Sequence, residues 1–377
     1  MEHTGKKLIV VKIGSSSLTD SKGSMDSDKI KNIVSQVAKL KDQGHKVILV
    51  TSGSISAGFR LLGYNERPKT IAAKQASASV GQGLLMEEYT KYFNDYGYVT
   101  AQILLTRGDF SDKRRYKNIV NTLDILLKRG AIPIINENDT VSIEELKIGD
   151  NDTLSAQVAA MVHADLLILL TDIDGLYSED PRKNPEAKKI EVVEEITKEI
   201  EAIAGSAGSS IGTGGMRSKI SAGKIAVASG VPMLITHSGK ENILLRVSEG
   251  DLDGSYFLAK DRKLNTRLQW MSFYSLAKGS ITVDEGAANA LEFGGKSLLP
   301  TGITKINGDF KPGDVVEVFN AAKKLIGKGI INYSSQELEQ LKGMSTQEIF
   351  KQTGKKKAEA IHRDNWVGSS KKRKEGI

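Results

Sequence analysis

The strongest constraint on the fold is a unit that recurs through roughly the first 240 residues: a short apolar run, a turn rich in Gly, Ser, Asn and Asp, and a helical stretch. Because the apolar runs are nearly continuous rather than alternating, they predict strands that are buried on both faces of a sheet. Strands and helices that alternate in this way are typical of an α/β fold, a mainly parallel sheet sandwiched by helices. Ligands of such sheets bind at the carboxyl ends of the strands, where these turns lie. The runs are residues 7–13, 47–50, 131–135, 166–170 and 231–235.

The spacing of apolar residues between these runs predicts the helices. In the first of them apolar residues recur every three or four positions, and Gly44 supplies a stop signal. Helices are expected over residues 28–43, 83–96, 114–129, 153–164, 192–204 and 216–229.

The pattern changes after about Gly254. Residues 261–270 are polar and predict a linker, and short strand-like pieces separated by Gly, Pro and Asp follow them. This pattern predicts a second, small, mostly β domain with strands over residues 280–283, 302–306, 314–319 and 325–331 and a helix over 284–292. We expect a first domain over residues 6–255, a linker over 256–276, the second domain over 277–365 and a basic tail over 366–377.

Composition excludes several classes of protein. The chain has no cysteine, which excludes disulfides, thiolate catalysis, iron–sulfur clusters and cysteine-based zinc sites. The five histidines have no zinc-ligand spacing, and no GxSxG hydrolase motif occurs. No run of about 18 apolar residues predicts a transmembrane helix. The apolar stretch Leu8–Val11 is followed at once by Lys12, unlike a secretory signal. We therefore expect a cytoplasmic protein that has no membrane partner.

The net charge of +7 lies mainly at the C-terminal end of the chain. Nine Lys/Arg and three Asp/Glu lie between Lys351 and Ile377, so this stretch carries six of the net positive charges and the preceding 350 residues carry one. Such a tail is most often a solvated terminus and less often a contact for RNA or another anion.

Two Gly/Ser turns follow the first two predicted strands. Lys12 stands one residue before the end of a buried strand, where an ammonium group is costly without an anionic partner. Gly14 and Gly53 allow the backbone to approach a ligand closely, and successive N–H groups there can bind an anion. A surface lysine before a serine-rich turn is the alternative for the first turn alone. Two such turns on one sheet favour an anion site.

Acidic and amide side chains follow the strand at 131–135. The two segments are Asn136–Asp139 and Gly149–Asp152, the second at the start of a predicted helix. Asp152 could simply cap that helix, whereas Asn136 and Asp139 cap no predicted helix. A cluster of this kind suits a zwitterionic substrate or a Mg²⁺-bound phosphate.

Two further turns complete the set of candidate sites. Thr171–Asp180 has a DxDG spacing but lacks the Glu of a calcium loop, because position 181 is Pro. Gly212–Lys219 is a glycine-rich entry to a helix, which is typical of a phosphate site, although a flexible linker is the alternative. Neither GxxxxGK[ST] nor GxGxxG is complete anywhere in the chain.

Taken together, these turns resemble the amino-acid kinase family. The most specific segments are Ile134–Asp139 with Gly149–Asp152, followed by Thr213–Met216. In the second domain, Val283–Ala287 with Ser297–Ile303 resembles the PUA module. The resemblance covers about residues 6–365. Within the family it is strongest to the branch that phosphorylates the γ-carboxylate of L-glutamate to L-glutamyl 5-phosphate, the first step of proline biosynthesis.

The resemblance implies substrates, cofactors and partners. ATP and Mg²⁺ would be required, with Mg²⁺ carried by ATP rather than by a protein site. L-Glutamate would be the second substrate, L-proline a feedback effector and the chain a homo-oligomer. Rivals are a kinase of the same fold for N-acetylglutamate, aspartate, carbamate or a nucleoside monophosphate, and an RNA-binding PUA protein. The Asn136–Asp139 segment and the second domain argue against the first rival, and the nearly neutral body of the chain argues against the second.

The resemblance also implies roles for individual residues. Lys12 and Lys219 would stabilise the γ-phosphoryl group from opposite sides, Asp152 would orient both lysines, and N–H groups near Gly14 and Gly53 would hold phosphate oxygens. Ser52, Asp139 and Asn151 would bind glutamate, with Asp150 a weaker candidate. The residues implied in ATP binding are Lys12, Thr171, Asp172, Thr213, Gly214, Gly215, Met216, Arg217, Ser218 and Lys219. The chain departs from the family pattern at Thr51, Ser54, Arg217, Ser218, His237 and Ser238.

Overall fold

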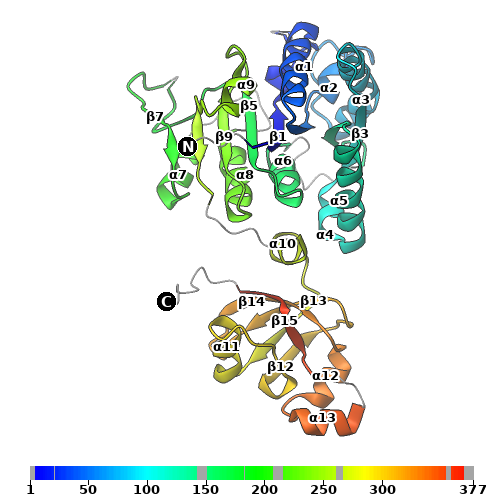
Figure 1. Cartoon of the computed structure of the whole chain (residues 1–377), viewed down its shortest axis with the longest axis vertical. Coiled ribbons are helices and arrows are strands. Elements are labelled where there is room, and N and C mark those ends of the chain that lie inside the picture. Colours follow the sequence, from blue (N-terminus) through cyan, green and yellow to red (C-terminus); the bar gives the residue numbers. More distant parts are fainter. Residues whose placement is uncertain are drawn as a thin grey trace. The chain divides into compact units, whose positions relative to one another are not determined.

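The computed structural model describes residues 5–20, 22–141, 151–181, 183–206, 215–259, 266–353 and 358–368. The chain divides into two units, residues 1–110 with 114–263 and residues 111–113 with 264–377 (Figure 1). The domain bounds expected from the sequence stay a prediction. Within the described ranges, no helix combines the length and the apolar character needed to cross a membrane.

A mainly parallel sheet organises the first unit and confirms the predicted α/β class. Its strands, in order across the sheet, are β3 (Thr100–Leu105), β4 (Ile132–Glu137), β2 (Lys46–Val50), β1 (Leu8–Ile13), β5 (Leu166–Thr171), β9 (Met233–His237), β10 (Ser255–Phe257) and β8 (Val192–Val193). All neighbours are parallel except β9 and β10. The central strands are buried on both faces, as their continuous apolar runs predict.

Helices cover both faces of this sheet (Figure 1). Those of the first unit are α1 (Ser27–Asp42), α2 (Ser54–Gly58), α3 (Ile71–Asn94), α4 (Arg107–Ser111), α5 (Lys113–Lys128), α6 (Asn151–Met161), α7 (Lys198–Ser206), α8 (Met216–Ala228) and α9 (Ile243–Ser248). Helix α1 begins after Asp26, whose carboxylate accepts hydrogen bonds from two N–H groups of the first turn. Its apolar face shares one core with α3, α9 and alternate residues of β1, and α6 and α8 pack on the sheet outside that core.

Helix α3 begins twelve residues before the predicted start at Gly83. The sequence signal was weak because Gly81 and Gly83 count against a helix. Gly81 lies against Gly58 of α2, and a Cβ at Gly81 would stand 1.8 Å from the carbonyl oxygen of Ser54. The two helices therefore cross backbone to backbone, and this packing requires a glycine where helix propensity disfavours one.

The helix predicted over residues 192–204 is wrong in its first half. Val192 and Val193 form β8 at the end of the sheet, where two β-branched residues suit a strand. Helix α7 begins at Lys198, after Thr197, whose hydroxyl accepts the N–H of Ile200 at 3.4 Å. A Thr cap before the helix was the signal that the interpretation missed.

The second unit is a mostly β domain, as predicted. Its strands, in sheet order, are β12 (Ile303–Gly308), β11 (Gly279–Val283), β13 (Val315–Phe319), β14 (Leu325–Ile331) and β15 (Ile361–Gly368). The helices are α10 (Thr266–Phe273), α11 (Glu285–Glu292), α12 (Ser335–Leu341) and α13 (Thr346–Thr353). Helix α10 lies in the segment expected to be a linker, and it packs on β14 and β15. The sequence analysis also missed β15 and the last two helices.

Candidate active site

The turns after four neighbouring strands meet at one edge of the first sheet. Strands β4, β2, β1 and β5 lie side by side and parallel, so their carboxyl ends share that edge. Buried polar and charged side chains gather in these turns and at the starts of the nearby helices: Lys12, Ser52, Ser54, Asn136, Asp139, Asn151, Asp152, Thr171 and Lys219. Buried groups of this kind in such a place indicate a functional site.

Two lysines converge on one carboxylate at the centre of this edge. The Nζ of Lys12, from β1, lies 2.6 Å from Oδ1 of Asp152, and the Nζ of Lys219, from α8, lies 3.1 Å from Oδ2. The Ser218 hydroxyl donates to the same Oδ2 at 2.6 Å. All three charged side chains are buried. The expectation that Lys12 needs a buried anionic partner is confirmed.

The electrostatic environment keeps Asp152 ionised. Burial by itself raises the pKa of Asp152, but the charges of Lys12 and Lys219 and the hydrogen bond from Ser218 outweigh it, so the pKa lies well below its usual range. Asp152 does lie in the first turn of α6, yet its oxygens bind side chains from β1 and α8. Its carboxylate is therefore an organising centre for two lysines rather than a simple helix cap.

The backbone beside Lys12 differs in one respect from the expected anion cradle. The N–H of Gly14 donates to the carbonyl of Leu170 in β5 at 3.1 Å, so it is part of the hydrogen bonding of the sheet. The 3-10 turn η1 (Ser15–Ser17) follows directly, and the first N–H groups of such a turn have no partner within it. The amides of Ser15 and Ser16, rather than that of Gly14, are the donors available at this strand end.

Asn151 links three of the turns. Its Nδ2 donates to the carbonyl of Thr51 at 2.8 Å, to Oγ of Ser52 at 2.9 Å and to Oδ1 of Asn136 at 3.0 Å. Among the described residues no group donates to its own Oδ1, which is buried. Asn136 in turn donates to Gln82 of α3 at 2.8 Å. The amide of Asn151 thus organises the site and leaves one acceptor for a ligand.

Asp139 presents a similar acceptor. Its Oδ2 accepts a hydrogen bond from the Ser54 hydroxyl at 2.8 Å, while its buried Oδ1 has no hydrogen-bond donor in the described part of the chain. Burial raises the pKa of Asp139 to about 6; the Ser54 hydrogen bond and the Arg67 charge oppose the rise, and the Glu137 charge adds to it. A cation that entered the site would satisfy Oδ1.

The segment expected to bind a nucleotide lies on the other side of the lysine pair. Thr171 ends β5 and is buried, and its hydroxyl donates to Oδ1 of Asp172 at 2.9 Å. Gly215 precedes α8, of which Met216 and Lys219 are buried and Arg217 is exposed. This geometry brings Thr171, Gly215–Lys219 and Lys12 to one sheet edge. Thr213, Gly214 and Asp150 lie outside the described residues.

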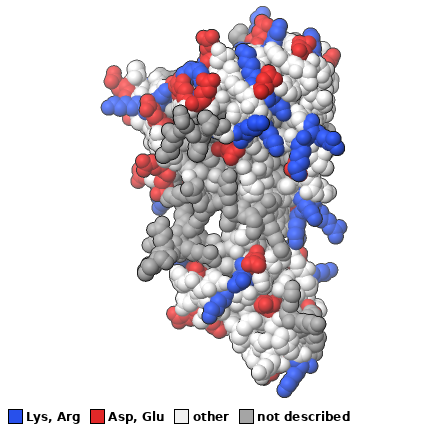
Figure 2. All heavy atoms as spheres, in the orientation of Figure 1, with Lys and Arg blue, Asp and Glu red and all other residues white. Residues whose placement is uncertain are grey.

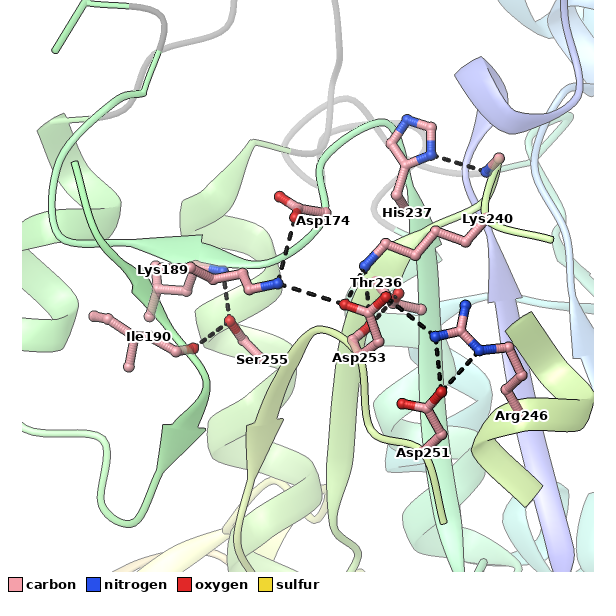
Figure 3. Close-up of polar contacts among 12 residues, drawn as sticks. Asp174, Lys189, Ile190, Thr236, His237, Lys240, Arg246, Asp251, Asp253 and Ser255 are labelled. Carbon is pink, nitrogen blue, oxygen red and sulfur yellow. Dashed lines mark hydrogen bonds and ion pairs between the residues drawn. The ribbon is translucent and has the colours of Figure 1, made fainter. Parts of the chain in front are cut away.

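Ion pairs tie the segment after Thr171 to the far strands of the sheet (Figure 3). Asp253 accepts from Lys240 at 2.5 Å and lies 3.5 Å from both Lys189 and Arg246. Lys189 also lies 3.4 Å from Asp174. These side chains are about one-fifth to two-fifths exposed, so each pair contributes little stability. Their main effect is to hold two parts of the chain together, because Asp174 and Lys189 precede α8 whereas Asp253 and its other partners follow it.

A serine completes this connection (Figure 3). The hydroxyl of Ser255 accepts the N–H of Leu176 at 2.7 Å and donates to the carbonyl of Ile190 at 2.5 Å. These two residues belong to the two strands of a hairpin, β6 (Leu176–Tyr177) and β7 (Lys189–Ile190). Sequence reasoning missed Asp253 and Ser255, because they fall at the expected end of the first domain and have no motif spacing.

The described residues contain no group of three or more His, Cys, Asp or Glu side chains that could hold a metal ion. Both carboxylate oxygens of Asp152 face ammonium groups.

Comparisons with known proteins agree with this architecture. Residues 7–237 match the family described as "Amino acid kinase family", and residues 279–352 match the PUA domain. A protein named glutamate 5-kinase from Thermoanaerobacter sp. (strain X514) is 52% identical over 360 residues, which cover 95% of this chain and 97% of that protein. Another of the same name, from Streptococcus sanguinis (strain SK36), is 51% identical over 362 residues, which cover 96% of each.

A solved structure shares the fold over about two thirds of the chain. Carbamate kinase from Giardia lamblia, bound to AMP-PNP, matches with a TM-score of 0.50 and 16% sequence identity, covering 68% of this chain and 100% of that chain. At this identity the likeness concerns the fold alone.

Proposed function

Because the chain belongs to the amino acid kinase family and, within it, to the glutamate 5-kinases that carry a PUA domain, we propose that it transfers the γ-phosphoryl group of ATP to the γ-carboxylate of L-glutamate. The products are ADP and L-glutamyl 5-phosphate, and the reaction opens proline biosynthesis. The observation that carries the proposal is the buried Asp152 held between Lys12 and Lys219 at the carboxyl ends of the strands.

The chemistry requires positive charge more than it requires a base. A glutamate carboxylate oxygen attacks the γ-phosphorus, a new P–O bond forms, and the bond to the β–γ bridging oxygen breaks as ADP leaves. No proton has to move, because the nucleophile is already ionised. The difficulty is to align two anions that repel each other and to stabilise charge on the transferring group. Lys12 and Lys219 supply that stabilisation, and Asp152 holds them in place.

The two unsatisfied acceptors suit the α-ammonium group of glutamate. Oδ1 of Asp139 and Oδ1 of Asn151 are both buried without a donor among the described residues, and an ammonium group offers three donors. The Ser52 hydroxyl accepts from Asn151, which leaves its hydrogen for a substrate carboxylate. An N-acylated glutamate has a neutral amide in place of the ammonium group and would offer fewer donors. The two acceptors therefore support glutamate as the substrate.

The nucleotide would occupy the opposite side of the lysine pair. Thr171 and Asp172 end β5, Gly215–Lys219 open α8, and Thr213 and Gly214 precede that helix. The amides of Ser15 and Ser16 would hold phosphate oxygens. Mg²⁺ bound to the ATP phosphates would neutralise part of their charge.

The finer parts of the proposal concern regulation, assembly and location. We include feedback inhibition by L-proline, a homo-oligomer and a cytoplasmic location, where ATP and glutamate are available. Inhibition of turnover by proline and a solution mass above 40.9 kDa would support the first two.

The decisive experiment follows ADP release with ATP, Mg²⁺ and L-glutamate, and traps the acyl phosphate with hydroxylamine. Glutamate-dependent ADP release with an equal yield of γ-glutamyl hydroxamate is expected. Asp152→Asn serves as the comparison, because it keeps the shape of the side chain and removes the charge that orients the lysines. ADP release that does not depend on glutamate, or no hydroxamate, would contradict the proposal.

A further inference from the structure

Ser54 donates a hydrogen bond to Asp139, one of the two residues with a buried acceptor proposed to bind the substrate. We propose that Ser54 is a positioning residue for glutamate, which holds one carboxylate oxygen of Asp139 so that the other is directed to the substrate ammonium group. This inference rests on the proposed function and extends it to a residue that does not itself touch the substrate.

The backbone fixes Ser54 tightly. It is the first residue of α2 and follows Gly53, whose φ of +103° lies in the left-handed region that glycine tolerates best. Its carbonyl oxygen faces Gly81 of α3 at the close crossing of the two helices. Its side chain is buried, so the hydroxyl has little freedom to choose another partner. Ser54 therefore reaches Asp139 from a rigid support, 85 residues away in the sequence.

The hydrogen bond differentiates the two oxygens of Asp139. Oδ2 accepts from Ser54 at 2.8 Å, while Oδ1 is buried and has no hydrogen-bond donor within the described ranges. A free carboxylate could rotate and present either oxygen, whereas one held by a hydroxyl presents a fixed edge. Preorganisation of this kind strengthens binding, because less orientational freedom is lost when the ligand arrives.

The same hydrogen bond affects the charge of Asp139. Burial and Glu137 raise the pKa of Asp139, and Ser54 and Arg67 lower it, with a result of about 6. Of the two groups that lower it, the Ser54 hydroxyl contributes more than the Arg67 charge. Without the Ser54 hydroxyl the pKa of Asp139 would rise further, toward neutral pH. A protonated Asp139 cannot pair with an ammonium group, so glutamate binding would weaken at a higher pH than in the wild type.

The test compares the dependence of KM on pH in matched variants. Ser54→Ala removes the hydroxyl, and Ser54→Thr and Ser54→Val form a pair of nearly equal volume that differs in the hydroxyl. Ser56→Ala is the control, because Ser56 is a buried serine of the same helix whose hydroxyl makes no hydrogen bond within the described part of the chain. KM for glutamate, KM for ATP and kcat are measured from pH 5.5 to 8.5.

For Ser54→Ala we expect KM for glutamate to rise about tenfold at pH 7, the loss expected for a hydrogen bond to a charged group. The pH at which this KM begins to climb should move upward, with kcat and KM for ATP within about twofold of wild type. Ser54→Thr should lie nearer to wild type than Ser54→Val, and Ser56→Ala should match wild type.

Two results would overturn the inference, and they are distinguishable. If the wild type turns over glutamate but Ser54→Ala and Ser54→Val keep its pH profile and its KM for glutamate, Ser54 has no positioning role and the proposed function stands. If the wild type shows no glutamate-dependent turnover, the proposed function fails and the inference fails with it. Should Ser54→Ala not fold, the Thr and Val pair decides by the same criterion.

Discussion

At the scale of single residues, the site depends on a balance of buried charge. Lys12, Lys219 and Asp152 are each nearly inaccessible to solvent, and a buried charge is tolerated only with a partner. Asp139 is different, because its burial favours the neutral carboxylic acid and so raises its pKa. Buried carboxylates whose pKa values are shifted in opposite directions are typical of functional sites.

The first prediction concerns the lysines. Lys219→Ala should lower kcat by about 10²–10³, because one preorganised positive charge on the transferring group is lost. Lys12→Ala should behave similarly. The double variant should lose less transition-state stabilisation than the two single variants together, since Asp152 holds both lysines. Steady-state kinetics on folded protein measure this, and an unchanged kcat would remove Lys219 from the catalytic group.

A second residue-scale prediction concerns substrate choice. Free glutamate has an α-ammonium group for the acceptor of Asp139, whereas N-acetylglutamate would leave that carboxylate buried and unpaired. We expect glutamate to be preferred by at least about 10³ in kcat/KM. Asp139→Asn should raise KM for glutamate much more than KM for ATP. Comparable turnover of both acids by the wild type, or an effect on ATP alone, would contradict the assignment.

A third prediction links Asp139 to stability. Its folded pKa of about 6 exceeds the usual unfolded value near 3.8, so ionising it costs stability as pH rises from about 4 to 6, and the full cost remains above that window. Asp139→Asn should therefore stabilise the ligand-free protein at pH 7, by about 1–3 kcal/mol, and by much less at pH 4. Denaturant unfolding at the two pH values measures the difference. A gain independent of pH would show that charge is not the cause.

At the scale of secondary structure, close helix packing determines where Ser54, the serine that holds Asp139, lies. A Cβ at Gly58 would stand 2.0 Å from the carbonyl oxygen of Ser77, and one at Gly81 would stand 1.8 Å from that of Ser54. Contacts this short involve backbone and cannot be relieved by a side-chain rotation. The crossing of α2 and α3 is therefore built on two glycines, and Ser54 moves with it.

The element-scale prediction uses a matched pair of glycines within α3. Gly81→Ala should destabilise the protein by several kcal/mol, about 3 or more, because the helices must separate. Gly83→Ala should stabilise it by about 1 kcal/mol, since nothing lies within 4 Å of its Cβ position and alanine favours a helix. Thermal or denaturant unfolding gives both values, and equal effects of the two substitutions would refute the packing argument.

At the scale of the whole molecule, the elements that carry the proposed catalytic residues all belong to the first unit. The strands and helices that carry Lys12, Asp152 and Lys219 lie within residues 1–263. On the face drawn in Figure 2, acidic and basic side chains both occur across the described surface. This mixture agrees with the near-neutral charge of the first 350 residues and does not favour RNA binding as a second function.

The whole-molecule prediction concerns truncation. A chain that ends at Lys263 should fold and retain glutamate-dependent turnover, since β10 remains paired with β9 and β8. A chain that ends at Gly254 should be clearly less stable, because it lacks β10. Removal of residues 369–377 alone should leave turnover within about twofold, because distant charges are screened at physiological salt. Complete inactivity of a folded 1–263 chain would show that the second unit contributes to the site.

Local patterns in the sequence were sufficient for the α/β class, for the four central strands and for the turns that carry the site. A buried parallel strand is nearly all apolar, and a turn after it needs Gly, Ser, Asn or Asp, so both signals lie within a few neighbouring residues. Two elements gave only a weak local signal: β8 has only two residues, and α3 has two glycines, Gly81 and Gly83, near its middle.

Only the tertiary structure decided which partners these residues have. Asp152 and Lys219 are 67 residues apart, Ser54 and Asp139 are 85 apart, and each pair meets because strands and helices pack side by side. Likewise, the amide of Gly14 donates a hydrogen bond to the neighbouring strand. Gly81 has no room for a side chain, because the carbonyl oxygen of Ser54 lies against it. Ion pairing, burial and close packing depend on distances in space, and no periodicity along the chain encodes them.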